Sequence, residues 1–293
     1  MKAGYISLVG RPNVGKSTLM NKLIKEKLAI VSDKSGTTRE QIRGITNIND
    51  TQYIFLDTPG IHKPRNLLGK FMTQTALKTL EESDVILFIL DGTQEISTGD
   101  MFVAENIRQV SSTPCIIIIN KIDKMTDNDI ETKKKEVSEK LGEFDNIITM
   151  TAEYGIGIHK IYDETKKYFK SDMWFYPEDY YTDMPVNRIV VEVIREKILL
   201  STRDEIPHSV VVEITNVNTK STIRHYDVTI YVERNSQKGI IIGENGSLIK
   251  KIGIESRKEI EELINLKVNL QLWVKVKKNW RKNKKFIEEM GYK

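Results

Sequence analysis

The chain carries two glycine loops, and each stands between an apolar run and a stretch with helical spacing. The first loop, GRPNVGKS, occupies residues 10–17, and the second, GENG, occupies residues 243–246. Such a loop lets successive backbone N–H groups point inward at an anion, and the N-terminus of the following helix adds positive potential. Either both loops hold nucleotide phosphates, or the second holds something else.

The first loop matches the pattern GxxxxGKS between an expected strand and an expected helix. Gly10 and Gly15 let the backbone curl around phosphate. Lys16 is expected to reach the β- and γ-phosphates, and the hydroxyl of Ser17 is expected to bind Mg²⁺. The pattern indicates a nucleoside triphosphate without saying which base.

The base is indicated by NKID at residues 120–123, which follows the apolar run from Cys115 to Ile119. The carboxylate of Asp123 can accept two hydrogen bonds from the ring N–H and amine of guanine, a pair that adenine does not offer there. Asn120 is expected to tie the loops together, and the stem of Lys121 is expected to lie along the base. The alternative is a surface turn.

A third segment, YIFLDTPGI at residues 53–61, suits a sensor of the γ-phosphate. Asp57 is expected to hold Mg²⁺ through water, and the N–H of Gly60 to meet the γ-phosphate. The loop SGTTRE at residues 35–40 offers Thr37 and Thr38, and the sequence does not decide which of them completes the Mg²⁺ shell. Both segments would be ordered by GTP and released on hydrolysis.

In this order and spacing, GRPNVGKS, TTR, DTPG and NKID resemble the Era and MnmE group of small GTPases. The resemblance makes TAEYGIG at residues 151–157 the fifth motif, with Thr151 in place of the usual serine and the N–H of Ala152 meeting the guanine oxygen. It implies a K⁺ at Asn13, and Ile61 stands where Ras-like enzymes carry glutamine. The implied catalytic residues are Lys16, Thr38, Asp57 and Gly60, and the implied nucleotide-binding residues are Gly10, Asn13, Val14, Gly15, Lys16, Ser17, Thr18, Asp57, Asn120, Lys121, Asp123, Thr151 and Ala152.

The two halves of the chain differ in charge. The whole chain of 293 residues has a formal charge of +4, but residues 186–293 hold 21 Lys and Arg against 14 Asp and Glu. The stretch from Leu263 to Ile287 contains no acidic residue and interleaves eight basic side chains with Trp273 and Trp280. This strip is expected to bind a polyanion; the alternative is a solvated basic tail.

The second loop lacks the lysine and the hydroxyl of a nucleotide site, so we expect it to clamp a nucleic-acid backbone, as in KH domains. The order of elements and KGIIIGENGSLIKKIG resemble the KH domain of the Era family. Glu244 departs from that pattern, because these loops usually hold a basic residue between the glycines. A plain helix-start turn is the alternative. The expected RNA-binding residues are Lys238, Ile242, Gly243, Glu244, Asn245, Gly246, Lys250, Lys251, Lys275 and Lys277.

The resemblance, which spans the whole chain, implies an α/β P-loop GTPase domain with a mostly parallel sheet at residues 1–170. A linker or docked strap follows at 171–185, then a smaller α+β type II KH domain at 186–293 with a basic C-terminal tail. It also implies a GTP/GDP switch that uses Mg²⁺, binds 16S rRNA near its 3′ end and acts in maturation of the small (30S) ribosomal subunit. We expect a cytoplasmic monomer, with peripheral association at the inner face of the cell membrane.

Two other functions fit parts of the sequence. A tRNA-modification GTPase of the MnmE kind would share the G-domain motifs, but the terminal cysteine and the flanking helical domain of that kind are not apparent. A non-enzymatic switch would recruit a membrane or protein partner through its basic face. The single cysteine, Cys115, lies in an apolar run, which predicts a buried structural thiol.

Overall fold

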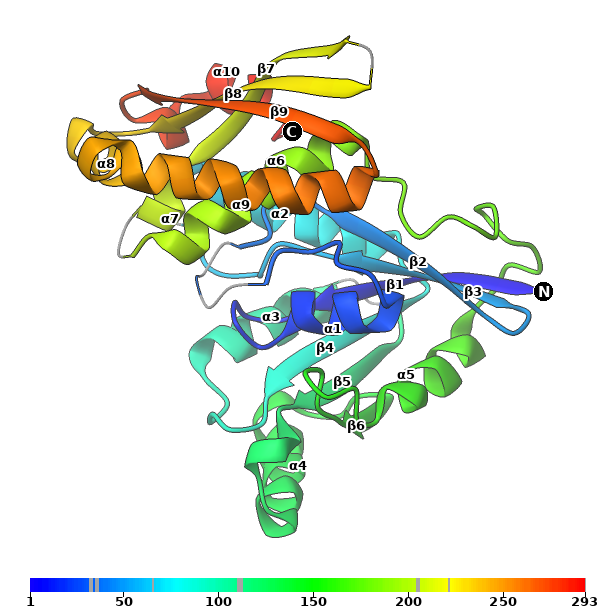
Figure 1. Cartoon of the computed structure of the whole chain (residues 1–293). Helices are drawn as coiled ribbons and strands as arrows, with labels where there is room; N and C mark the ends of the chain where they lie inside the picture. The colour runs from blue at the N-terminus through cyan, green and yellow to red at the C-terminus, as the bar shows by residue number, and fades with distance from the viewer. Residues whose placement is uncertain are drawn as a thin grey trace. The chain divides into compact units, whose positions relative to one another are not determined.

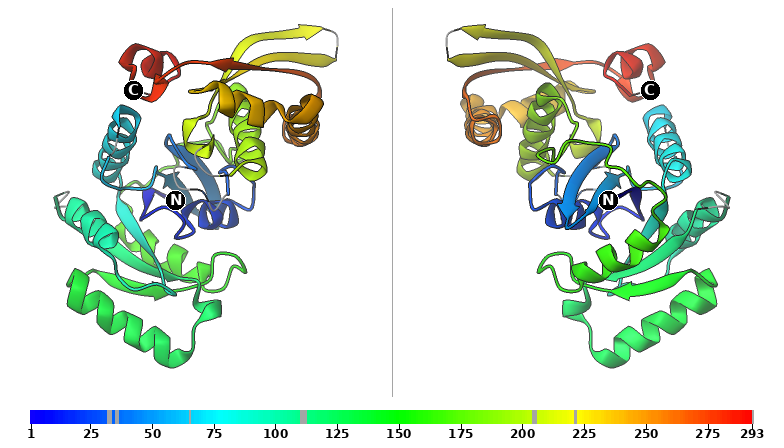
Figure 2. Two further views of the ribbon diagram at one scale, coloured as in Figure 1. Left: turned by 90° about the vertical axis from the view of Figure 1, so that its left-hand side faces the viewer. Right: turned by 90° about the vertical axis from the view of Figure 1, so that its right-hand side faces the viewer.

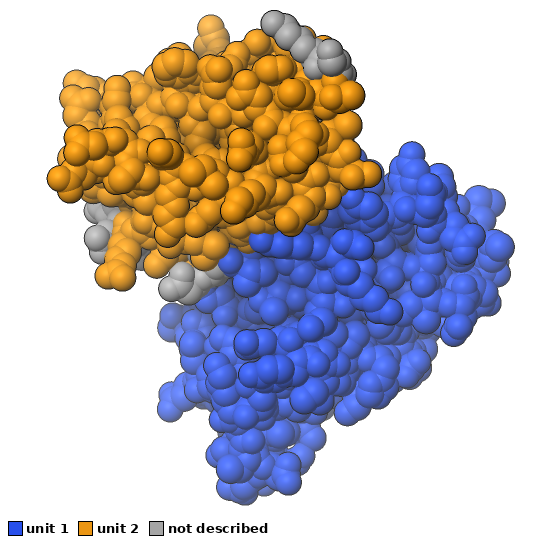
Figure 3. Space-filling view, in the orientation of Figure 1, with its two compact units in different colours: residues 1–31, 38–65, 69–183 blue, residues 32–37, 66–68, 184–293 orange. Residues whose placement is uncertain are grey.

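The computed structural model describes residues 1–31, 34, 37–64, 66–109, 113–203, 206–220 and 222–292. The chain divides into two compact units, which Figure 3 distinguishes by colour. Unit 1 comprises residues 1–31, 38–65 and 69–183, and unit 2 comprises residues 32–37, 66–68 and 184–293. No helix of the described residues is both long enough and apolar enough to cross a membrane.

Unit 1 is built on a six-stranded sheet in the order β2-β3-β1-β4-β5-β6, with only β2 antiparallel to its neighbour (Figure 1). Every residue of β4 and β5 is buried, which is why both appear in the sequence as unbroken apolar runs. The strands are β1 (Lys2–Val9), β2 (Ile42–Ile48), β3 (Thr51–Asp57), β4 (Val85–Asp91), β5 (Cys115–Asn120) and β6 (Asn146–Thr149).

Helices cover both faces of this sheet. One core joins the sheet to α2, α3 and α4, which Figure 2 shows on one side of it. Cys115 lies in this core, and burial raises the pKa of its thiol. The helices of unit 1 are α1 (Lys16–Ile24), α2 (Leu67–Glu81), α3 (Thr98–Gln109), α4 (Asp127–Leu141) and α5 (Ile158–Thr165), with short 3₁₀ turns η1 (Ile122–Lys124) and η2 (Lys166–Tyr168).

Residues 171–183, which we call the strap, belong to unit 1 and pair with its edge. The backbone N–H of Ile45 in β2 donates to the carbonyl of Tyr181 over 2.9 Å. The buried side chain of Gln52 accepts from the N–H groups of Phe175 and Tyr176 at 2.9 and 3.0 Å. The sequence pattern left a linker and a docked strap as alternatives for 171–185, and hydrogen bonds to β2 and β3 favour the docked strap.

Unit 2 contains a three-stranded sheet in the order β7-β8-β9, in which β7 and β8 are antiparallel and β8 and β9 are parallel. Its core is formed by this sheet together with α6, α8 and α9. The elements are α6 (Val186–Ser201), α7 (Ile206–Ser209), β7 (Val211–Lys220), β8 (Ile223–Val232), α8 (Asn235–Ile242), η3 (Glu244–Gly246), α9 (Ser247–Ile264), β9 (Lys267–Val276), η4 (Trp280–Lys282) and α10 (Lys284–Glu289).

The two tryptophans of the basic strip have opposite environments. Trp273 is 56% exposed on β9, an edge strand whose side chains alternate between the core and solvent. Trp280 is completely buried, and its indole N–H donates to the carbonyl of Ser209 over 2.7 Å. The expectation that both rings belong to a polyanion-binding face is therefore wrong for Trp280, which is a core residue.

Candidate functional site

The first glycine loop joins β1 to α1 in a conformation that requires its glycines. Gly10 has φ 151° and Gly15 has φ 101°. A Cβ at Gly10 would lie 2.4 Å from the carbonyl oxygen of Ile89, and a Cβ at Gly15 would lie 2.3 Å from Nδ2 of Asn120. Asn13, between them, has φ 69°. Helix α1 begins at Lys16, so its first N–H groups face the loop.

Lys16 lies inside this loop. Its Nζ donates to the carbonyls of Gly10 and Arg11 at 3.1 and 2.8 Å. Burial lowers the pKa of Lys16 to about 8, and the nearby carboxylate of Asp57 opposes that shift. The ammonium is thus held by backbone oxygens at the point where the loop could receive phosphate. Val14 is buried and Thr18 is half-buried beside it.

The expected Mg²⁺ side chains come together from three segments. Oδ2 of Asp57, at the end of β3, accepts hydrogen bonds from Ser17 Oγ at 2.9 Å and Thr38 Oγ1 at 3.1 Å. These two hydroxyls are also 3.1 Å apart. Thr37 instead donates its hydroxyl to the carbonyl of Lys34. The structure therefore brings Thr38, and not Thr37, to Ser17 and Asp57.

This cluster has the chemistry of a Mg²⁺ site. Oδ1 of Asp57 is buried beside these hydroxyls. A carboxylate and two hydroxyls supply the hard oxygen ligands that Mg²⁺ prefers, alongside water and nucleotide phosphates. Among the described residues, no three His, Cys, Asp or Glu side chains gather as a metal site of protein ligands alone. Ser17, Thr38 and Asp57 thus fit an ion that is completed by a nucleotide.

The segment after Asp57 packs against the first loop. A Cβ at Gly60 would lie 3.1 Å from the backbone nitrogen of Pro12, so the two backbones approach closely. The carbonyl of Gly60 is 2.8 Å from Nδ1 of His62. Ile61 is completely buried in the core shared with α2 and α3. Its side chain cannot orient water at the site by hydrogen bonding.

The loops after β5 and β6 are fastened to the first loop by Asn120, which is 3% exposed. Its Nδ2 donates to the carbonyl of Val14 over 2.8 Å, and its Oδ1 accepts from the N–H of Ala152 over 2.9 Å. Thr151 Oγ1 donates to Oδ1 of Asp123 over 3.0 Å and accepts from the N–H of Asp123 over 3.1 Å. The expected guanine-binding residues are therefore brought together around the P-loop.

Sequence reasoning missed several residues of this site. Nζ of Lys121 donates to the carbonyl of Asn13 over 3.1 Å and to Oδ2 of Asp91 over 2.6 Å. Arg11 forms an ion pair with Asp100 over 2.7 Å. Asp91 closes an apolar strand, which was a usable signal because ligands bind at the carboxyl ends of parallel strands. Nothing in the sequence paired Arg11 with Asp100.

The second glycine loop connects α8 to α9 in unit 2. Gly243, Asn245 and Gly246 all have positive φ, at 73°, 49° and 76°. A Cβ at Gly243 would lie 2.8 Å from both Cβ and N of Leu248. Glu244 and Asn245 are exposed, so the carboxylate lies at the surface of the loop.

The expected basic residues lie on the elements that flank this loop. Lys250 and Lys251 are exposed in the first turns of α9, and Lys238 is half-exposed in α8. Ile242 is half-buried against the core of unit 2. Exposed Lys275 ends the outward-facing row of β9, and Nζ of Lys277 lies 4.9 Å from the ring centroid of Phe286.

Comparisons with known proteins match both parts of the chain that carry these loops. Residues 5–121 match a family described as 50S ribosome-binding GTPase, and residues 205–281 match the KH domain family. The chain is 56% identical over 293 residues to GTPase Era of Fusobacterium nucleatum, covering 100% of this chain and 99% of that protein.

Two solved structures resemble the whole chain. One is a single-residue variant of Aquifex aeolicus Era bound to GDP·AlF4⁻, with a TM-score of 0.95 and 37% identity. The other is Era in complex with MgGDPNP and nucleotides 1506–1542 of 16S ribosomal RNA, with a TM-score of 0.96 and 38% identity. Each match covers 100% of this chain and 99% of the solved chain. A sequence match and two structural matches over the full length show that this chain belongs to the Era family of GTPases.

Proposed function

We propose that this protein is a GTP-hydrolysing switch whose KH domain holds 16S rRNA near its 3′ end. The convergence of Ser17, Thr38 and Asp57 carries the first half of the proposal, because it joins the P-loop to the two segments that a γ-phosphate would order. The related Era that binds MgGDPNP and nucleotides 1506–1542 of 16S rRNA supports both halves.

In this proposal each site residue has one role. The P-loop amides and Lys16 hold the β- and γ-phosphates, and Asp123 binds the guanine edge with Thr151 orienting its carboxylate. Ser17 and Thr38 would hold Mg²⁺ directly and Asp57 would hold it through water; when bound, the ion would supply positive charge next to the phosphates. The N–H of Gly60 meets the γ-phosphate, and that of Ala152 meets the guanine oxygen.

We further propose that hydrolysis uses K⁺ at Asn13. Buried Ile61 stands where Ras-like enzymes carry glutamine and cannot orient the attacking water by hydrogen bonding, and Asn13 is exposed on the P-loop. A monovalent cation there would add positive charge where an arginine finger acts in other GTPases. Turnover in KCl should exceed turnover in NaCl at equal ionic strength, and equal rates would refute this part.

The second loop is proposed as the RNA clamp. Gly243 and Gly246 allow the backbone to approach phosphates closely, and Lys238, Lys250 and Lys251 supply positive charge in place of exposed Glu244. We propose that GTP tightens this grip by roughly 5- to 150-fold, the range of typical couplings between sites. We propose that this GTP-controlled RNA binding acts in maturation of the small ribosomal subunit. We also propose that the protein is a cytoplasmic monomer.

Labelled single-stranded RNA of the 16S 3′ end tests the proposal, with a GTP analogue, GDP or no nucleotide. The native protein is compared with Gly243→Asp, and Gly239→Ala on α8 is the control because its added Cβ meets nothing within 4 Å. GTP-dependent tightening that Gly243→Asp abolishes supports the proposal. Unchanged binding in that variant would mean that the loop is only a turn.

The basic strip from Leu263 to Ile287 also suits an anionic membrane. We propose peripheral binding to such a membrane as a secondary property. Vesicles with and without anionic lipid, in competition with the same RNA, separate the two partners. Binding to anionic lipid with no preference for RNA would instead favour the non-enzymatic switch. GTP hydrolysis, measured against ATP, separates that switch from an enzyme.

A further inference from the structure

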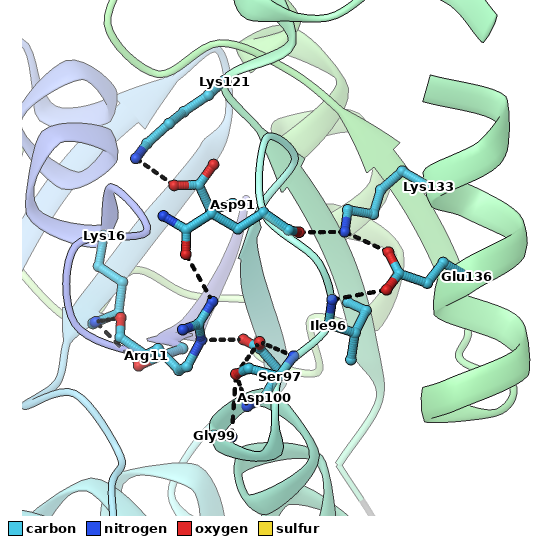
Figure 4. Close-up of polar contacts among 12 residues, drawn as sticks. Arg11, Lys16, Asp91, Ile96, Ser97, Gly99, Asp100, Lys121, Lys133 and Glu136 are labelled. Carbon is cyan, nitrogen blue, oxygen red and sulfur yellow. Dashed lines mark hydrogen bonds and ion pairs between the residues drawn. The ribbon is translucent and has the colours of Figure 1, made fainter. Parts of the chain in front are cut away.

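Residues 91–100 run from the end of β4 into the first turn of α3, and Figure 4 shows Asp91 beside Lys121 and Asp100 beside Arg11. We call this the 91–100 segment. Two of its carboxylates, at its first and last residues, each hold a basic side chain from a nucleotide-binding loop. Neither carboxylate belongs to the motifs that define the site.

Asp91, at the start of the segment, holds the lysine of the guanine motif. Its Oδ2 accepts from Nζ of Lys121 over 2.6 Å, while its Oδ1 accepts from the N–H and hydroxyl of Thr93 at 3.1 and 2.6 Å. Burial alone would raise the pKa of Asp91, but these hydrogen bonds outweigh it and leave the pKa below its usual value. The ionised carboxylate fixes Lys121 where its Nζ also reaches the carbonyl of Asn13.

Asp100, at the end of the segment, holds the arginine of the P-loop. Its Oδ1 lies 2.7 Å from Nε of Arg11, and its Oδ2 accepts from the N–H and hydroxyl of Ser97 at 3.0 and 2.8 Å. Asp100 is 1% exposed. A Cβ at Gly99 would lie 2.7 Å from Cδ of Arg11, so the absence of a side chain there makes room for the arginine stem.

The arginine connects this carboxylate to the phosphate-binding lysine. The backbone carbonyl of Arg11 is the closer of the two oxygens that hold Lys16, at 2.8 Å. The guanidinium also donates to the side chain of Gln94 over 3.2 Å. Holding the Arg11 side chain in place therefore also holds its backbone carbonyl, which positions the ammonium of Lys16.

Helix α4 forms hydrogen bonds with the middle of the 91–100 segment, at Gln94 and Ile96. Nζ of Lys133 donates to the carbonyl of Gln94 and lies 2.6 Å from Oε2 of Glu136. Oε1 of Glu136 accepts from the N–H of Ile96 over 2.8 Å. The 91–100 segment is thus hydrogen-bonded to α4 as well as to Arg11 and Lys121, which limits its movement relative to the two nucleotide-binding loops.

We propose that Asp91 and Asp100 are positioning residues for nucleotide binding, Asp91 through Lys121 for the guanine base and Asp100 through Arg11 for the phosphates. This inference rests on the proposed GTP-binding function. Neither carboxylate touches the nucleotide. Asp91 positions Lys121, whose side chain contacts the base. Asp100 positions Arg11, whose backbone carbonyl holds Lys16. Both contacts are in place before the nucleotide binds.

The test compares Asp100→Asn, Arg11→Met and their double variant in the full chain, with fluorescent GDP and GTP as probes. Each single change should weaken binding about tenfold, the effect of one charge-assisted hydrogen bond. The double variant should lose no more than either single one, because both remove the same contact. KM for GTP should rise with the lost affinity.

Asp91→Asn tests the guanine side in the same way, with an expected loss of about tenfold for GDP. Arg11→Lys should recover part of the affinity lost in Arg11→Met, since it keeps a charge for Asp100. Glu131→Gln is the control because it breaks an exposed ion pair with Lys134 elsewhere on α4.

The outcomes separate the possibilities. If the native protein binds no guanine nucleotide, the proposed function fails before the inference is reached. If it binds and both aspartate variants stay within twofold of it, the inference is overturned. If the variants only unfold more easily, with unchanged affinity at temperatures where they are folded, the carboxylates support the fold and position nothing.

Discussion

Replacing Asn120 by alanine should separate the three loops of the nucleotide site. The side chain bridges the carbonyl of Val14 and the N–H of Ala152, and it is 3% exposed. The change leaves one buried acceptor and one buried donor without a partner. Each such group costs about 1–3 kcal/mol, so the GDP-bound protein should lose at least about 2 kcal/mol.

That cost will be divided between two measurements. In the nucleotide-free protein the loops can open and pair with water, which relieves part of the penalty. GDP requires the closed arrangement, so the relieved part reappears as lost affinity, which is about 30-fold or more if the whole penalty is relieved in the nucleotide-free protein. Titration with a fluorescent GDP gives Kd, and urea unfolding with and without saturating GDP gives the free energy of unfolding.

Two further variants sharpen this test. Asn120→Asp keeps an acceptor for the N–H of Ala152 but turns a carboxylate oxygen toward the carbonyl of Val14, so it should bind GDP no better than Asn120→Ala. Asn128→Ala, at an exposed position of α4, is the control and should change neither the Kd for GDP nor the free energy of unfolding. The reasoning is refuted if Asn120→Ala lowers the unfolding free energy of the GDP-bound protein by less than about 0.5 kcal/mol.

Three other perturbations have outcomes that follow from single contacts. Gly15→Ala places a Cβ 2.3 Å from Nδ2 of Asn120 at φ 101°, so GDP titration should show an affinity loss of about 30-fold or more. Glu136→Gln should lower the free energy of unfolding by about 1 kcal/mol at pH 7. Although burial alone would raise the pKa of Glu136, its hydrogen bonds lower it to about 2, so that difference, measured by urea unfolding, should vanish as the pH falls from 4.5 through 2. Gln52→Ala removes three hydrogen bonds to the strap, so chymotrypsin should cleave residues 171–183 about tenfold faster while GDP affinity stays within twofold.

Each of these outcomes can contradict its premise. An alanine at position 15 that binds GDP normally would mean that the loop has another conformation in solution. A Glu136→Gln deficit that persists at pH 2 would come from packing and not from charge. Unchanged cleavage of the Gln52→Ala strap would show that its other contacts, with β2 and with Ala3 of β1, are enough to hold its backbone.

Much of the site could be predicted from the sequence because its residues are close in the chain or follow buried strands. The P-loop, Asp57 and NKID each stand at the carboxyl end of an apolar run, where a parallel sheet gathers them at one edge. The glycines of both loops were recognisable because only glycine combines positive φ with close backbone approach.

Other features depended on contacts between distant residues. The sequence left Thr37 and Thr38 equivalent, and only the approach of Asp57 separates them. It placed Trp280 on a binding face, whereas the indole lies in the core with its N–H on the carbonyl of Ser209. It left open whether residues 171–185 form a linker or a docked strap, and the hydrogen bonds with Gln52 and β2 show that residues 171–183 are docked.

The sequence by itself determined the chemistry of this protein, because phosphate, Mg²⁺ and guanine each require particular groups at short spacings along the chain. The tertiary structure alone decided what holds those groups in place. Arg11 and Asp100 are 89 residues apart, and no local pattern couples a P-loop arginine to an aspartate in the first turn of a later helix. Such pairs form because burying one charge requires an opposite charge nearby, and only the folded backbone determines which residue can supply it.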